Sequence, residues 1–169
     1  NIGLVYCRQK VIDEVAKTET INMRKCYSGE VFDKLIEGNF IGSTSFVLIK
    51  KECFDECGLF DVRMKSAQDY EMWLRIAQKY KVTYVDEPLV TYYKHTSERI
   101  STNPYNKIQG MEFINKLYSD YLDKNKNIKS IKIIRTIPYY IIIGERKKAI
   151  KKYIQAVRVA PLNIKSNLK

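Results

Sequence analysis

Residues 66–80, SAQDYEMWLRIAQKY, carry the pattern that decides the fold of the N-terminal part of this chain. The i, i+3, i+4 and i+7 positions of a helix are taken here by Tyr70, Trp73, Leu74 and Ala77. That spacing predicts an amphipathic helix with one apolar face. The apolar residues 82–85 follow almost at once and predict a buried strand. A helix that leads directly into a strand indicates helices packed on a sheet.

The segments before and after this helix alternate between strand and helix patterns. β-Branched and apolar runs predict strands at residues 2–8, 45–49 and 82–85, with Pro88 interrupting the last one before it resumes over residues 89–93. Helical spacing predicts short helices at residues 29–38 and 52–57, and Gly58 ends the second of them. The mixed, polar residues 11–27 predict a loop with irregular or strand-like pieces. We therefore expect residues 1–100 to form an α/β domain.

The C-terminal part reads as helical and basic. Helices are expected over residues 106–125, 128–144 and 145–160, so residues 101–169 form a helical extension. The longest apolar run, residues 137–143, is far shorter than the ~20 residues that span a bilayer.

Net charge divides the chain in the same way. Residues 1–100 carry 15 Lys and Arg against 15 Asp and Glu, whereas residues 101–169 carry 15 against 4. The whole excess of +11 therefore lies in the extension. A localised excess indicates a surface for phosphate, nucleic acid or anionic lipid, and a solvated lysine-rich helix face is the alternative.

The cysteine pattern argues against a zinc centre. Cys53 and Cys57 lie four residues apart, on one face of a helix, while Cys7 and Cys26 are isolated. A structural zinc site needs four ligands, and the chain has one histidine and no second closely spaced pair. Buried free thiols in a reducing compartment are the expected state.

Asp69 is the strongest candidate for chemistry, and it has two interpretations. With Ser66 it matches a helix start, where a carboxylate complements the helix dipole. Alternatively, it is a general base that takes a proton from a hydroxyl. Asp69 and Glu71 are not expected to hold one metal ion, because residues two apart on a helix point ~200° away from each other.

His95 is a second candidate, at the end of the last strand. A neutral imidazole there can ligate a divalent ion or bond a phosphate, and a surface histidine without a role is the alternative. Asp86 and Glu87, just before Pro88, are expected to be solvated turn residues.

Four segments, in this order and spacing, resemble one known family. They are residues 39–51 (NFIGSTSFVLIKK), 54–61 (FDECGLFD), 68–75 (QDYEMWLR) and 87–95 (EPLVTYYKH). Together they resemble the C-terminal half of family 2 glycosyltransferases with the GT-A fold, which are nucleotide-sugar transferases of bacterial polysaccharide synthesis. The resemblance covers residues 2 to about 100.

The resemblance implies roles for particular residues. Asp69 matches the base that activates the acceptor hydroxyl, although the glutamate that usually precedes it is Gln68 here. The turn at residues 58–61 matches the border of the acceptor pocket, and His95 matches a contact to metal or pyrophosphate. The acceptor-binding residues implied are Gly58, Phe60, Asp61 and Trp73.

The implied reaction transfers a sugar from a nucleotide-sugar donor to a hydroxyl of a glycan or lipid-linked acceptor, with inversion. The family also needs an Asp-x-Asp motif and a divalent cation, Mg²⁺ or Mn²⁺, in its nucleotide-binding half. No Asp-x-Asp occurs in the sequence. The resemblance therefore implies that this half is absent, that the chain alone is inactive, and that the sheet edge beside residues 2–8 is open to self-association.

The alternative to an enzyme is a basic helical module that binds a membrane or nucleic acid without catalysis. Lysines at 147, 148, 151 and 152 beside Ile150 and Ile154 suit an anionic membrane surface. The basic and aromatic residues form no known nucleic-acid motif, so no nucleic-acid partner is expected. An enzyme that uses lipid-linked acceptors would be cytoplasmic and peripheral at the inner face of the membrane.

Overall fold

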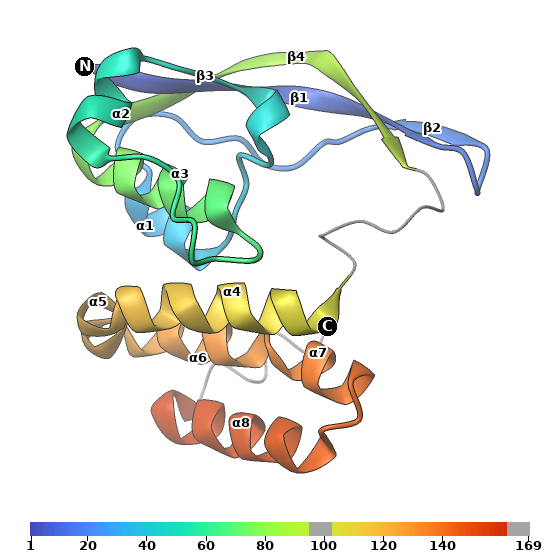
Figure 1. The fold of residues 1–169 in the computed structure, drawn as a ribbon, viewed down its shortest axis with the longest axis vertical. Helices are drawn as coiled ribbons and strands as arrows, with labels where there is room; N and C mark the ends of the chain where they lie inside the picture. The colour runs from blue at the N-terminus through green and yellow to red at the C-terminus, as the bar shows by residue number, and fades with distance from the viewer. Residues whose placement is uncertain (95–102, 162–169) are drawn as a thin grey trace. The chain divides into compact units, whose positions relative to one another are not determined.

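The computed structural model describes residues 1–94 and 103–161 of the chain, and it is a mixed α/β structure (Figure 1). The chain divides into two compact units. The first contains residues 1–61 and 68–98, and the second contains residues 62–67 and 99–169. Residues 62–67 therefore belong with the helical part, which the sequence pattern did not predict.

Strand β1 (Ile2–Asp13) is the central strand of the sheet in the first unit. On one side it pairs antiparallel with β2 (Thr18–Ile21) and β3 (Val47–Ile49). On the other side it pairs in parallel with β4 (Lys81–Lys94) along its whole length. The prediction of an open edge beside residues 2–8 is therefore wrong, because β3 and β4 return to opposite sides of β1. Self-association through a sheet edge stays a proposal and would have to use another strand.

The strand-like pieces predicted within residues 11–27 form a hairpin. β1 runs on to Asp13 and turns back into β2 as a hairpin. Asp13 fixes the turn, since its Oδ1 accepts hydrogen bonds from the backbone N–H groups of Val15 and Ala16 at 3.1 and 3.0 Å.

β4 does not break at Pro88. Cys7 pairs with Val85 and Gln9 with Val90, so residues 86–89 form a bulge opposite Arg8 alone. A bulge accommodates proline because the proline ring nitrogen has no N–H to give to a ladder. Asp86, expected to be a solvated turn residue, lies in this bulge and forms an ion pair with Arg8.

Three α-helices and a 3₁₀ turn complete the described part of the first unit: α1 (Phe32–Glu37), η1 (Thr44–Phe46), α2 (Lys51–Cys57) and α3 (Gln68–Lys79). Figure 1 shows α1 and α3 on the same face of the sheet. The core between them includes fully buried Leu4, Leu35, Trp73, Leu74 and Val82. The apolar stripe read from the sequence is thus the face of α3 that packs in this core, as amphipathic spacing requires.

The second unit contains α4 (Pro104–Leu117), α5 (Ser119–Lys124), α6 (Lys126–Ile134), α7 (Ile137–Ile142) and α8 (Arg146–Val159). Asn103 caps α4, since its side chain accepts from the N–H groups of Tyr105 and Asn106. The expected helices at 106–125 and 128–144 are each broken in two. Pro138 in the first turn of α7 explains the second break, because proline is accepted where a helix begins.

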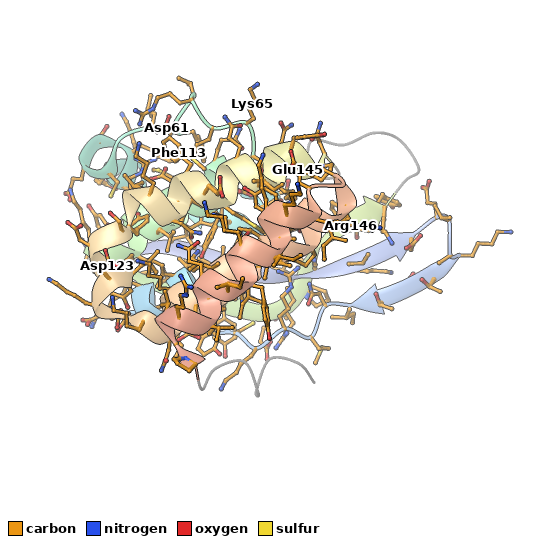
Figure 2. All side chains as sticks on the ribbon, turned by 90° about the horizontal axis from the view of Figure 1, so that it is seen from below. Asp61, Lys65, Phe113, Asp123, Glu145 and Arg146 are labelled. Carbon is orange, nitrogen blue, oxygen red and sulfur yellow. The ribbon has the colours of Figure 1, made fainter. Side chains whose placement is uncertain are left out.

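The helices of this unit pack around a small core. α8 lies against α6 and α7, and α4 contacts α5, α6 and α7. Figure 2 labels Asp123 near the end of α5 and Arg146 at the start of α8. Gly110 of α4 meets the segment 62–67 closely, because a Cβ there would lie 2.5 Å from the carbonyl oxygen of Ser66. No helix in the described residues is both long enough and apolar enough to cross a membrane.

Candidate functional site

The candidate site centres on the turn at residues 58–61, GLFD, which we call the GLFD turn. It follows α2 directly. Gly58 has φ +79°, a backbone conformation in which a side chain is strained, and its N–H donates to the carbonyl of Phe54 at 2.9 Å. Glycine is the usual residue at such a helix end because it has no Cβ to clash. Gly58 therefore sets the direction in which the turn leaves α2.

Arg75 of α3 holds the GLFD turn in place through hydrogen bonds. Its guanidinium donates to the carbonyl oxygens of Cys57 and Leu59, the latter at 2.8 Å. The same guanidinium donates to both carboxylate oxygens of Glu71, with Nε–Oε1 and Nη2–Oε2 distances of 2.8 Å. Glu71 is only 2% exposed. A buried carboxylate thus orients the arginine that orients the turn.

One sequence signal marks this arrangement. Glu71 and Arg75 are four residues apart with the acid first, the favourable order for a pair on a helix. Both carboxylate oxygens of Glu71 are engaged by Arg75.

Aromatic rings stack through the turn into the core. The Phe60 ring lies edge-on to Trp73 with centroids 6.1 Å apart, and it is 6.2 Å from Phe54. Phe60 is 37% exposed, whereas Trp73 is fully buried and its indole N–H donates to the carbonyl of Gly42 at 3.0 Å. The structure therefore brings Phe60 and Trp73 together but offers only Phe60 to a ligand, with Trp73 supporting it from the core.

Asp61 ends the turn and is partly exposed; Figure 2 labels it. Leu59, between Gly58 and Phe60, is well exposed. The turn thus presents an apolar patch next to a carboxylate. Such a combination suits a sugar, whose C–H face packs on an aromatic ring while its hydroxyls bond to a carboxylate.

Asp69 lies in the first turn of α3, the helix that also carries Trp73 and Arg75. It is half-buried, and its Oδ1 accepts a hydrogen bond from the backbone N–H of Tyr70 at 2.7 Å. The Tyr70 hydroxyl donates to the carbonyls of Leu35 and Ile36 in α1, at 2.8 and 3.1 Å. This bonding anchors the start of α3, so the Asp69 carboxylate is held on a rigid support. One helix therefore positions both the candidate base and the turn.

The predicted metal contact cannot be built from this part of the chain. No group of three or more His, Cys, Asp or Glu side chains that could hold a metal gathers among the described residues. His95 lies outside them, so its predicted contact with metal or phosphate stays a prediction.

All four cysteines are free thiols, but only Cys53 is buried as expected; the other three are partly exposed. Cys53 is buried, and its Sγ donates to the carbonyl of Gly3 at 3.4 Å. Burial raises the pKa of Cys53 and of Cys57, so both favour the neutral thiol.

A second polar cluster, which sequence reasoning missed, lies along β1. Arg8 donates to the carbonyls of Asn22 and Arg24 at 3.2 and 2.9 Å, in addition to its ion pair with Asp86. The Tyr6 hydroxyl accepts from the N–H of Tyr27 at 2.7 Å and donates to the Tyr27 carbonyl at 3.0 Å. Burial raises the pKa of Tyr6 far above its usual range. These groups bond one another and fasten residues 22–27 to the sheet, which is a structural role.

Comparison with known proteins gives one informative result. A curated protein of Haemophilus influenzae (strain ATCC 51907 / DSM 11121 / KW20 / Rd), named "Uncharacterized glycosyltransferase", is 26% identical over 169 residues. The match covers 91% of this chain and 53% of that protein. The similarity supports a glycosyltransferase. It does not favour a binding module without catalysis.

The chain spans about half the length of this glycosyltransferase relative. No family model matches the chain, and no solved structure matches it. The glycosyltransferase role is therefore supported in general terms, and family 2 membership and the GT-A fold stay predictions.

Proposed function

We propose that this chain is the acceptor-side part of a family 2 glycosyltransferase of the GT-A type. It would transfer a sugar from a nucleotide-sugar donor to a hydroxyl of a glycan or lipid-linked acceptor in bacterial polysaccharide synthesis. The observation that carries the proposal is the role of α3. Its first turn holds Asp69, and its Arg75 and Trp73 hold the GLFD turn.

In the proposed reaction, the acceptor hydroxyl attacks the anomeric carbon of the donor sugar. The Asp69 carboxylate accepts the hydroxyl proton as the new C–O bond forms. The bond from the sugar to the nucleoside diphosphate breaks on the opposite face, which inverts the anomeric configuration. Phe60 and Asp61 in the GLFD turn would hold the acceptor sugar beside the base, and Gly58 shapes that turn.

A divalent cation, Mg²⁺ or Mn²⁺, would neutralise charge on the departing diphosphate when bound. The residues described here do not provide its cluster of oxygen ligands. We propose that residues outside this chain hold it, with His95 as a further contact.

The proposal predicts where activity resides. The 169-residue chain alone should show no sugar transfer, whereas a full-length protein should transfer sugar and lose activity when the cation is chelated. Release of nucleoside diphosphate and formation of glycosylated product measure the activity of each protein. As the control, added Mn²⁺ or Mg²⁺ should restore the activity of the chelated full-length protein. Turnover by the isolated chain with purified donor and acceptor would contradict the proposal.

We further propose that α8 holds the enzyme at the inner face of the cytoplasmic membrane. Ile150 is 60% exposed, and Tyr153 and Ile154 are also exposed. Ile150 and Ile154 line an open groove together with Lys147 and Lys151. An exposed apolar strip beside cations suits the interface of an anionic bilayer.

The structure separates the four lysines that the sequence grouped together. Lys148 and Lys152 form ion pairs with Glu145 and Glu112, whereas Lys147 and Lys151 lie on the groove. Lysines already paired with carboxylates have less charge to offer a membrane. Lys147 and Lys151 are therefore the lysines to replace in a test of membrane binding.

Changing both Lys147 and Lys151 to Gln should weaken binding to anionic vesicles by about 30-fold. This follows from ~1 kcal/mol per charge near an anionic surface. Vesicle flotation measures the effect, and turnover of a soluble acceptor should stay unchanged. The control changes exposed Lys51 and Lys81 of the first unit to Gln, which removes the same net charge. Equal vesicle binding by both double variants would favour the solvated-face interpretation of α8.

A further inference from the structure

Four lysines from three helices line one cavity in the helical unit. The cavity has a volume of about 380 Å³. α4 contributes Lys116, α6 contributes Lys129 and Lys132, and α8 contributes Lys152. In the primary sequence these lysines are spread over residues 116–152 and form no motif.

Lys132 is the most unusual of the four, because it is only 8% exposed. Lysine is almost never buried to this degree, since removing an ammonium group from water is costly. Burial, with a smaller contribution from the charge of Arg135, lowers the pKa of Lys132 to about 7. A buried lysine of this kind is stabilised in its charged form when an anion reaches it.

The carboxylate in the cavity lining is already engaged. Glu112 accepts a hydrogen bond from the Tyr140 hydroxyl at 2.8 Å and lies 2.7 Å from the Lys152 ammonium. Although burial opposes it, hydrogen bonds from these two groups lower the pKa of Glu112. Lys129 pairs with Asp123, which is not among the lining residues. Two of the four lining lysines, Lys129 and Lys152, are therefore already paired with carboxylates.

Neutral polar groups also line the cavity. Asn115, Ser119 and Gln155 line the cavity. Within the described residues, Oδ1 of Asn115 is a buried side-chain oxygen that makes no hydrogen bond. Turning the amide over places its NH₂ group at the same position, where it can donate to an anion.

We propose that this cavity binds a phosphate group of a phosphorylated ligand. The lysine ammonium groups would neutralise its charge, and the Ser119 hydroxyl and the amides of Asn115 and Gln155 would bond its oxygens. Lysine is a common phosphate ligand that acts as a point charge. The near-complete burial of Lys132 suits a compact terminal phosphate better than the backbone of a duplex. This proposal does not depend on sugar transfer.

Calorimetric titration of the 169-residue chain with inorganic pyrophosphate tests the site. Near pH 8 the free protein holds Lys132 largely neutral, because its pKa is about 7. Bound phosphate stabilises the charged form and raises that pKa, so Lys132 should take up close to one proton, which is measured as the difference in net proton uptake between the parent chain and Lys132→Met because pyrophosphate itself can release a proton on binding. Repeating the titration in buffers of different ionisation enthalpy measures the uptake. The other titratable groups of the wall are Glu112, Lys116, Lys129 and Lys152, with Arg135 nearby.

Lys132→Met is the decisive variant. Methionine keeps most of the length of the side chain and removes the buried charge, and thermal unfolding without ligand checks that the variant still folds. Pyrophosphate affinity should fall at least about tenfold, as expected for a lost charge-assisted bond, and net proton uptake should fall by close to one proton. Lys124→Met, at an exposed position of α5, is the matched control and should bind as the parent chain does. Unchanged affinity and proton uptake in Lys132→Met would overturn the proposal.

Vesicles distinguish a lipid headgroup from a soluble phosphate. Flotation compares phosphatidylcholine vesicles with vesicles that also contain phosphatidic acid, whose phosphate is a monoester. If Lys132→Met loses both pyrophosphate and phosphatidic-acid binding, the site takes a lipid phosphate. If it loses pyrophosphate binding alone, the site takes a soluble phosphate. If neither ligand responds to Lys132→Met, the cavity is not a phosphate site.

Discussion

Replacing Asp69 by Asn in the full-length protein should lower the rate of sugar transfer ~100- to 10,000-fold, the usual cost of losing a general base. The melting temperature should stay the same. Asn keeps the shape of Asp and the side-chain oxygen that accepts from the N–H of Tyr70. An amide cannot take a proton from the acceptor hydroxyl at neutral pH. Catalysis and stability therefore respond differently to this one change.

Asp33→Asn is the matched control for this experiment, because Asp33 is also a carboxylate in the first turn of a helix of the same unit. It should leave both turnover and melting temperature close to those of the parent. Steady-state turnover and thermal unfolding of the two variants give the comparison. Should Asp69→Asn keep more than about a tenth of parental turnover, well outside the base-loss range, Asp69 has the helix-dipole role instead.

Replacing Arg75 by Leu should lower the free energy of unfolding by about 3–5 kcal/mol, the cost of leaving one partner of a buried ion pair alone. Glu71 would keep its burial and lose the guanidinium that accounts for its hydrogen bonds from Nε and Nη2. The carbonyls of Cys57 and Leu59 would lose the same donor. Urea unfolding followed by tryptophan fluorescence measures the loss, since Trp73 is the one tryptophan of the chain.

The double variant Glu71→Leu with Arg75→Leu should recover part of that loss, because it leaves no unpaired charge in the core. Lys34→Leu breaks the exposed pair with Glu37 and should cost less than about 1 kcal/mol. If Arg75→Leu costs no more than Lys34→Leu, the Glu71–Arg75 pair does not hold the GLFD turn.

Much of the first unit could be predicted because its elements follow local patterns. The stripe of α3, the helix end at Gly58 and the apolar run of β1 each depend on residues a few positions apart. Local sequence patterns also identified Asp69 as a carboxylate at the start of a helix and the GLFD turn as the segment that follows the end of a helix. The concentration of net positive charge after residue 100 follows directly from counting the charged residues in the sequence.

Only the tertiary structure decided how those elements combine. Arg8 meets Asp86 across 78 positions of sequence, and Asp86 and Glu87, which are exposed as expected, lie in a bulge of β4 and not in a turn. The central place of β1 depends on both β3 and β4 pairing with it, and hydrophobic alternation does not specify which strands are neighbours. The sequence does not show whether Trp73 contacts an acceptor or packs in the core. The structure shows that it is fully buried.

Buried charges were the hardest features to predict, for one physical reason. Sequence shows that Glu71, Lys132 and Arg75 are charged, but their cost and their use depend on how much water the fold removes around them. That desolvation comes from helices and turns brought together from separate parts of the chain. The sequence by itself determined the elements, the candidate base and the basic C-terminal part. The fold decided that Glu71 orients a turn and that Lys132 faces a cavity shared with three other lysines.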